Sequence, residues 1–201
     1  MFYHVYSRGV DKRPTFQSSK EFKRFHKQLD EFRFEKSDPT LQSVQVHCYA
    51  LLNNHFHLLV EELVPDGISR FMQRLGTGYT LFFNKRNERN GPLFSGTYKR
   101  KLITSEEYLS HLAVYLHANP LSLISPNWRT AKDSAQDLIN KLCHYQWSSL
   151  RDWVNSFNGF CPLDTTLFGS LENHLELLHG YVIGCRMLQL NGGFEVEPPL
   201  C

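Results

Sequence analysis

Residues 44–61 read VQVHCYALLNNHFHLLVE, and they carry the strongest structural signal in the chain. On both sides of the centre, apolar side chains recur at every second position, which is the period of a β-strand. The Asn53-Asn54 pair at the centre suits a two-residue hairpin turn, because asparagine tolerates positive φ values. The sequence therefore predicts an antiparallel hairpin with strands at 44–52 and 55–61.

Alternation along the second strand places His55, His57 and Leu59 on one face of the predicted sheet. Two histidines in this arrangement could bring two imidazole nitrogens onto one ion without bending the backbone. Two ligands are too few for a tight structural site, whereas a divalent ion that acts on phosphates needs open positions for substrate oxygens. Taken alone, such a pair more often consists of two ordinary surface or core histidines.

The segments that flank the hairpin predict the rest of the sheet and two helices. A helix is expected between Ser19 and Lys36, where Phe22, Phe25, Leu29 and Phe32 recur at spacings of three and four, and Asp38-Pro39 ends it. The other predicted elements are a first strand at 2–7, a helix from about Ile68 into 85–90, and a fourth strand at 98–103. The order β-α-β-β-α-β is that of a ferredoxin-like antiparallel sheet, so the predicted fold class is α+β.

A third helix is expected after the sheet, followed by a helical extension. Thr104 and Glu107 have the spacing of a capping box, and the helix must end near Asn119 because Pro120 follows. Beyond it, a tryptophan-rich stretch leads to a further predicted helix at 167–182. The predicted domains are a catalytic domain at residues 1–125 and a C-terminal extension at residues 126–201, packed on the same unit.

The third helix carries a second group of chemically capable side chains. Tyr115 and Asn119 are one turn apart on one face, so a phenol and an amide oxygen could approach the same ion. A phenol with a pKa of about 10 is a weak nucleophile at neutral pH, although a nearby metal can stabilise the charge that develops on a phosphate. The alternative is that Tyr115 packs on the sheet and Asn119 caps the helix. His111 is a possible further polar neighbour.

Composition and charge limit the class of protein. The chain has 201 residues, 41% of them hydrophobic, without an apolar run of eighteen residues or the order of a signal peptide. We therefore expect one catalytic unit in a soluble, cytoplasmic protein. The five cysteines are scattered and odd in number, which argues against a disulfide framework or a structural zinc site and favours thiols.

The net charge is only +2, but basic residues gather between residues 84 and 101 with aromatic rings between them. Cations that meet phosphates, beside rings that stack on bases, are what a single-stranded nucleic-acid groove requires. The alternative is an ordinary solvated helix end and loop. The candidate DNA-binding residues are Arg8, Lys85, Arg86, Arg89, Tyr98, Lys99, Arg100 and Lys101.

Four ordered motifs resemble those of the single-tyrosine HUH transposases, and most closely the branch associated with repetitive extragenic palindromes (REP). The first three are Tyr3-His4-Val5 with Ser7-Arg8-Gly9, Asn54-His55-Phe56-His57-Leu58-Leu59, and Gly91-Pro92-Leu93-Phe94 with Gly96-Thr97-Tyr98. The fourth is Tyr115-Leu116-His117-Ala118-Asn119-Pro120, and Tyr145-Gln146-Trp147-Ser148-Ser149 is similar to a later signature of that branch. The resemblance spans roughly residues 2–150.

This resemblance implies a metal-dependent nuclease and strand-transferase that acts on hairpin single-stranded DNA through a 5′-phosphotyrosine intermediate. It implies that His55, His57 and Asn119 hold Mg²⁺ or Mn²⁺ and that Tyr115 is the nucleophile. No nucleotide cofactor and no membrane partner are expected, and a monomer associated with the bacterial nucleoid is favoured over a dimer.

Two other functions stay open on the sequence alone. One is a non-catalytic RNA- or DNA-binding module, in the manner of RRM domains, built on the same order of strands and helices. The other is a cleavage-dead relative that binds hairpins as a regulator. A covalent adduct on single-stranded DNA would separate the enzyme from both.

Overall fold

The computed structural model describes residues 1–155 and 161–190. The chain folds as two compact units, and the boundary between them in the sequence lies between Thr104 and Ser105. The first unit contains β1 (Phe2–Arg8), η1 (Val10–Lys12), α1 (Ser19–Phe32), β2 (Val44–Leu51), β3 (His55–Glu62), α2 (Gly67–Arg86) and β4 (Lys99–Leu102). The second contains α3 (Glu106–Ala118), α4 (Leu121–Ile124), α5 (Ala135–Cys143), α6 (Ser149–Asn155), α7 (Thr165–Phe168) and α8 (Leu171–Leu190). The predicted catalytic domain at 1–125 stays a prediction, since these units are defined by compactness alone.

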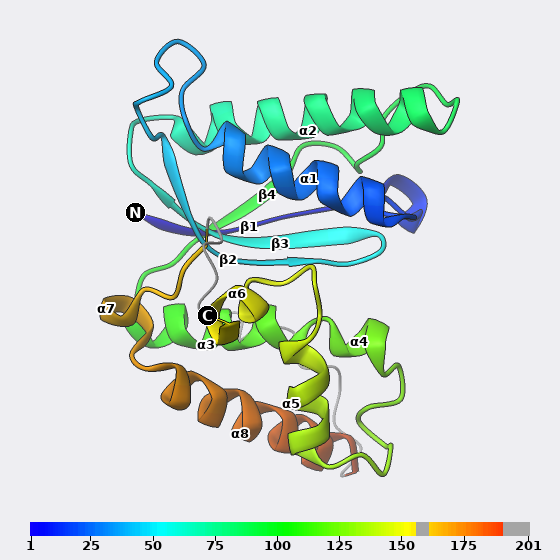
Figure 1. The fold of residues 1–201 in the computed structure, drawn as a ribbon, viewed down its shortest axis with the longest axis vertical. Helices are drawn as coiled ribbons and strands as arrows, with labels where there is room; N and C mark the ends of the chain where they lie inside the picture. Colours follow the sequence, from blue (N-terminus) through cyan, green and yellow to red (C-terminus); the bar gives the residue numbers. More distant parts are fainter. Residues whose placement is uncertain (156–160, 191–201) are drawn as a thin grey trace. The chain divides into compact units, whose positions relative to one another are not determined.

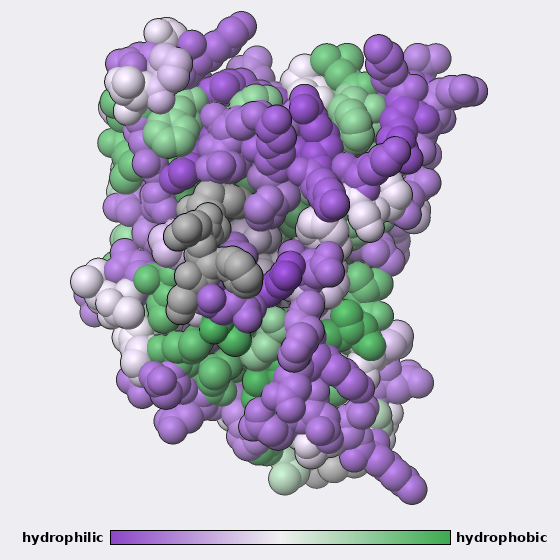
Figure 2. Space-filling view, viewed as in Figure 1, coloured by the Kyte–Doolittle hydropathy of each residue, from purple (hydrophilic) through white to green (hydrophobic). Residues whose placement is uncertain are grey.

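The first unit has the predicted ferredoxin-like fold. Its four described strands form one antiparallel sheet in the order β2-β3-β1-β4, so β3 and β1 are central and β4 is an edge strand. Helices α1 and α2 pack against each other on one face of this sheet (Figure 1). This face is called the helix face below, and the opposite face, which carries His55 and His57, the histidine face. Figure 2 shows hydrophilic side chains over the outer surface of α1.

An aromatic core joins α1 and α2 to the sheet. Phe25 of α1 lies at the centre of it, with ring centroids 4.9 Å from Phe56 of β3 and 4.9 Å from Tyr79 of α2. Tyr79 is fully buried, and its hydroxyl donates a 2.6 Å hydrogen bond to the carbonyl of Thr15. Each large apolar side chain buried in this way contributes about 1.5–3 kcal/mol to folding.

The predicted hairpin forms, but its turn is stabilised by hydrogen bonds with another segment and not by positive φ values. Leu52 N–H donates to the carbonyl of His55, so Asn53 and Asn54 form the two-residue loop, yet neither of them has a positive φ. Their carbonyls accept hydrogen bonds from the segment at residues 9–16 instead. The loop is therefore fixed by tertiary contacts and not by the left-handed backbone that we predicted for asparagine.

Strand β2 contains a bulge that corrects the predicted alternation. Val46 pairs with Val60 and Cys48 pairs with Leu59, so His47 is one extra residue in β2. Residues before the bulge and residues after it therefore change faces, and the prediction that positions 44 to 52 alternate without interruption is wrong. His47 Nε2 lies 3.1 Å from a carboxylate oxygen of Glu61, which gives the bulged side chain a partner on β3.

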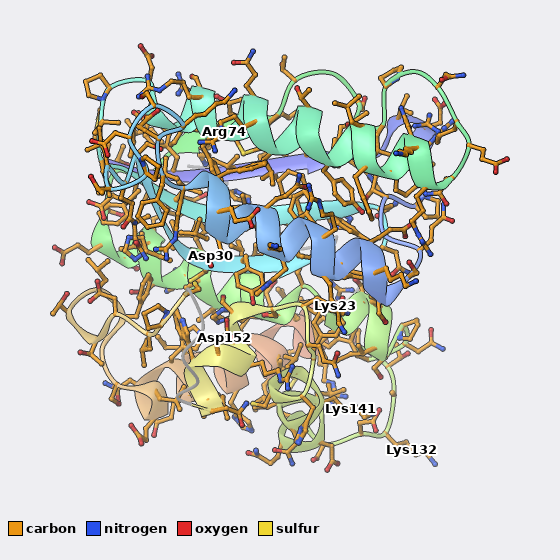
Figure 3. The ribbon with its side chains drawn as sticks, turned by 45° about the horizontal axis from the view of Figure 1, so that its top comes forward. Lys23, Asp30, Arg74, Lys132, Lys141 and Asp152 are labelled. Atoms are coloured by element: carbon orange, nitrogen blue, oxygen red, sulfur yellow. The ribbon has the colours of Figure 1, made fainter. Side chains whose placement is uncertain are left out.

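The first helix ends four residues earlier than predicted, at Phe32. The carbonyl of Arg33 accepts hydrogen bonds from Ser43 N–H and from the Ser43 hydroxyl, which draws the chain out of the helix. Arg74 of α2 donates to the carbonyls of Phe32 and Phe34 at the same place (Figure 3). These contacts outweigh the helical pattern of the sequence up to residue 36.

All the regular elements in the described part of the second unit are helices, joined by turns and loops. Its buried core joins α3, α5 and α8 through Val114, Leu138, Leu142, Leu178 and Val182. Helix α3 begins one residue later than predicted, because Ser105, and not Thr104, is the N-cap and accepts from Tyr108 N–H. The helix predicted at 167–182 is divided into α7 and α8 at Gly169, which has a φ of +68°.

Two general expectations can be compared with the described residues. The cysteines at positions 48, 143, 161 and 185 are thiols, as predicted, and Cys201 lies outside the described residues. Within the described residues, no helix is long and apolar enough to cross a membrane.

Candidate functional site

His55 and His57 lie on β3 with their side chains on the histidine face, as the alternation predicts. Their ring centroids are 5.1 Å apart, and the two rings are perpendicular. Pairing with β1 places His57 opposite Tyr6 and His55 opposite Arg8. Because residues directly opposite each other in an antiparallel pair share a face, Tyr6 and Arg8 belong to the same surface as the histidines.

Both histidines are oriented through the Nδ1 atom of the ring. His57 Nδ1 lies 2.9 Å from His4 Nε2, and His55 Nδ1 lies 2.7 Å from Asn54 Oδ1. The Asn54 amide is itself fixed, because its Nδ2 donates a 3.0 Å hydrogen bond to the carbonyl of Lys12. Asn54 Oδ1 can only accept, so the His55 proton sits on Nδ1. The corresponding tautomer of His57 donates from Nδ1 to His4, and in both rings Nε2 is then the atom that would bind a metal.

The electrostatic surroundings of His57 and of its partner His4 favour the neutral form of both rings. Burial lowers the pKa of His57 well below its usual value of 6.5, and the neighbouring His4 and His55 lower it further. Burial, with the positive charge of Lys101, lowers the pKa of His4 to about 4. A neutral imidazole is the form that binds a metal ion, so His57 needs no deprotonation at neutral pH.

The donor set fits a catalytic metal better than a structural one. Within the described residues, no group of three or more His, Cys, Asp or Glu side chains is placed to hold an ion. The two imidazoles of His55 and His57 would supply two of the ligands of the metal site predicted from the sequence. Such a pair needs at least one further ligand, and it leaves coordination positions for substrate oxygens.

Tyr115 and Asn119 lie on the other compact unit, on α3 and at its C-cap. Both are half-buried, and Asn119 N–H donates a 3.0 Å hydrogen bond to the Tyr115 carbonyl, as expected for residues one turn apart. His111 is exposed on the same helix. Since the histidines belong to the first unit and the tyrosine to the second, the four-residue site stays a prediction.

The opposite side of α3 contains a buried network that sequence reasoning missed. His117 is fully buried, with Nδ1 2.8 Å from His174 Nε2 and Nε2 2.8 Å from the Ser149 hydroxyl. Trp153 packs edge-on against His117 at 4.6 Å. Burial, together with His174, lowers the pKa of His117 well below its usual value. This neutral network fixes the rotation of the helix that carries Tyr115 against α6 and α8.

Three of the seven candidate DNA-binding cations lie on β4. Pairing with β1 places Lys99 opposite Tyr6 and Lys101 opposite His4, so both lysines lie on the histidine face. Arg100 is opposite Val5 and lies on the helix face, with its guanidinium 5.5 Å from the ring of Tyr3. The edge strand thus has cations on both faces. Charged edge strands also prevent unwanted strand pairing, so this feature alone does not identify a DNA surface.

The remaining candidates near the end of α2 take part in contacts within the protein. Arg86 Nε lies 3.6 Å from a carboxylate oxygen of the buried Glu21. Arg89 donates to Asn84 Oδ1 and to the Pro92 carbonyl. Lys85 is exposed in the last turn of α2.

His4 and Asn54 are the functional residues that the sequence did not assign. Both stand inside motifs that had been singled out, and His4 alternates with Tyr6 along β1. The sequence pattern does not reveal the register between β1 and β3, which brings His4 next to His57, 53 positions later in the chain. The signal for Asn54 was present, but it was interpreted only as a turn residue.

The four-stranded antiparallel sheet and its helices make this an α+β protein whose fold is consistent with an HUH transposase-like fold. No protein-family model and no curated protein matches the sequence. The chain is similar to a solved structure described as a REP-associated tyrosine transposase bound to a REP hairpin, with a TM-score of 0.50 and 12% sequence identity. The similarity covers 81% of this chain and 83% of that chain. At this identity it shows the fold alone.

Proposed function

We propose that this protein binds hairpin single-stranded DNA and cuts and rejoins it through Tyr115. The observation that carries the proposal is the preorganised histidine pair, in which His4 and Asn54 hold the Nδ1 atoms of His57 and His55. A histidine held in this way is typical of a metal ligand whose ring orientation matters. The solved structure with a similar fold is a transposase bound to a DNA hairpin, which supports the same class of substrate.

The proposed reaction exchanges one phosphate ester for another. Tyr115 Oη attacks the phosphorus of a DNA phosphodiester and loses its proton, while the bond from phosphorus to O3′ breaks and O3′ takes up a proton. The products are a 5′-phosphotyrosine and a 3′-hydroxyl. Attack by another 3′-hydroxyl reverses the step and releases Tyr115. Because the ester bond is conserved, the reaction requires no nucleotide cofactor.

The residues of this chain would orient the phosphate and offset its charge. His55 Nε2, His57 Nε2 and the side-chain oxygen of Asn119 would hold Mg²⁺ or Mn²⁺. The chemistry that such an ion supplies when bound is polarisation of the scissile phosphate. Arg8 and Lys99 share the histidine face and would contact flanking phosphates.

Covalent trapping on a labelled single-stranded hairpin tests this proposal. Wild-type protein with Mn²⁺ is expected to give a species on a denaturing gel that a chelator or Tyr115→Phe abolishes. Tyr108→Phe is the matched control, since it removes a phenol from the same helix and should leave the adduct intact. A hairpin that binds wild-type protein tightly without forming an adduct under any metal would refute catalysis and favour a cleavage-dead hairpin-binding regulator.

A further inference from the structure

A cavity of about 430 Å³ lies on the helix face of the first unit, away from the paired histidines. Its walls are α2 and residues 92–98, and Ser7 of β1 and Phe56 of β3 contribute from the sheet. Leu81 and Thr97 at its rim are exposed, so the cavity opens to solvent. The volume is in the range of small-molecule sites, which is about 300–1,000 Å³.

The lining of this cavity suits a flat, neutral, polar ring. Four aromatic side chains, Phe25, Phe56, Phe94 and Tyr98, contribute to the walls, and the rings of Phe56 and Phe94 are perpendicular at 5.6 Å. Hydroxyl groups are interspersed with them, and Ser69 Oγ lies 3.4 Å from the Tyr98 hydroxyl across the cavity wall. Hydroxyls can both donate and accept, so they can match the mixed edge of a nucleobase. None of the described residues that line the cavity is charged, which excludes a phosphate from its interior.

Cations stand outside the cavity and not within it. Arg100 follows Tyr98 by two residues in the extended chain that leads into β4, so it lies on the same face of the sheet as the cavity. Arg89 donates a 3.0 Å hydrogen bond to the carbonyl of Pro92, which is a lining residue. A neutral interior with a positive rim is complementary to a nucleotide whose base enters and whose phosphate stays in water.

We infer that this cavity binds one unpaired nucleobase of the DNA strand, with Arg100 and Arg89 on the adjoining phosphates. The inference rests on the proposed function and adds a second contact point for the same strand. The edge strand connects the two contact points, because Lys99 and Lys101 lie on its histidine face and Arg100 lies on its helix face. A strand that passes over β4 from the base site toward the histidines would meet the exposed side chains of Arg100 and Lys99.

Gly76 offers a way to fill the cavity without disturbing the fold. It lines the cavity from α2, and a Cβ atom added there would meet no atom within 4 Å. Gly76→Leu therefore places an apolar side chain in the space proposed for the base, and leucine favours the helix more than glycine does. Gly180→Leu is the matched control, because Gly180 lies on α8 of the second unit and its added Cβ also meets nothing within 4 Å.

The probe is a series of single-stranded hairpins that carry 2-aminopurine, a fluorescent adenine analogue, at one unpaired position at a time. In wild-type protein, one position is expected to change its fluorescence on binding, and Gly76→Leu should abolish that change and weaken binding about tenfold, the loss of one stacked base. Gly180→Leu should behave as wild type. Adduct formation at saturating DNA is followed on the same samples.

The outcomes separate this inference from the proposed function. An adduct that forms in wild type, together with unchanged affinity and 2-aminopurine response in Gly76→Leu, overturns the base site and leaves catalysis standing. A response that Gly76→Leu abolishes, without any adduct in wild type, supports the base site and refutes catalysis. Wild-type protein that binds none of the hairpins overturns both.

Discussion

Two glycines two residues apart in α2 should respond to the same substitution in opposite directions. Replacing glycine by alanine within a helix gains about 1 kcal/mol, because alanine loses less backbone entropy on folding. At Gly76 an added Cβ meets nothing within 4 Å, so Gly76→Ala should keep that gain in full. At Gly78 the Cβ would lie 2.8 Å from Gln28 Nε2 and 3.3 Å from Phe32 Cε2. Gln28 is fully buried and cannot swing into solvent.

Overpacking of this kind costs about 1–3 kcal/mol, which exceeds the gain in helix propensity. Gly78→Ala should therefore be about 1 kcal/mol less stable than wild type, and about 2 kcal/mol less stable than Gly76→Ala. Urea denaturation followed by far-UV circular dichroism measures both differences. Tryptophan fluorescence is the wrong probe here, since Trp128, Trp147 and Trp153 all lie in the second unit. Equal stabilisation by the two substitutions would refute the close approach of α1 and α2 at Gly78.

Three further predictions concern the histidines. Burial lowers the pKa of His174 to about 4, so the unfolded chain binds the proton more tightly and the free energy of unfolding should fall as the pH drops from about 6.5 towards 4. In an NMR titration the His174 ring should stay neutral down to pH 5, and a midpoint near 6.5 would contradict its burial. Ser149→Ala removes the hydroxyl that lies 2.8 Å from His117 Nε2 and should lower the free energy of unfolding by about 1–3 kcal/mol, measured by urea denaturation. An unchanged urea midpoint would show that this network does not stabilise the fold. His4→Ala should weaken Mn²⁺ binding about 10–100-fold, measured by calorimetry, because His57 loses the partner that orients its ring. The same Mn²⁺ affinity in the variant and in the wild type would show that His4 has no role in metal binding.

Local features of the fold were predictable because their causes are local. Alternation identified β3 and the face of His55 and His57, and helical periodicity identified α1 and α2. The order of these elements then restricted the sheet to a ferredoxin-like arrangement, which the structure confirms.

Features that depend on distant residues were not predictable. The bulge at His47 follows from pairing with β3 and from its contact with Glu61, neither of which the alternation of β2 reveals. The partner of His57 required the register of β1 against β3. The cavity beside α2 is lined by residues from α1, α2, two strands and residues 92–98, and no periodic pattern in the sequence encodes such a space.

The predicted site consists of four residues, two histidines in the first unit and Tyr115 and Asn119 in the second. His55 and His57 share one face of β3 as predicted, and hydrogen bonds with Asn54 and His4 orient their rings. Tyr115 and Asn119 have the predicted one-turn spacing on α3. Their meeting with the histidines depends on the arrangement of two compact units, which a sequence pattern does not contain.

The buried network on α3 has a consequence for the newly synthesised chain. The first unit has all of its strands once residue 102 has left the ribosome, and domains that emerge first generally fold first. His117, in contrast, bonds to Ser149 and His174, which follow it by 32 and 57 residues. Strand β3 can therefore fold before α8 has been synthesised, whereas α3 lacks its packing partner until then. A prematurely terminated chain would keep the proposed metal ligands of β3 but lack a fixed position for Tyr115, so the proposed reaction would require the longer product.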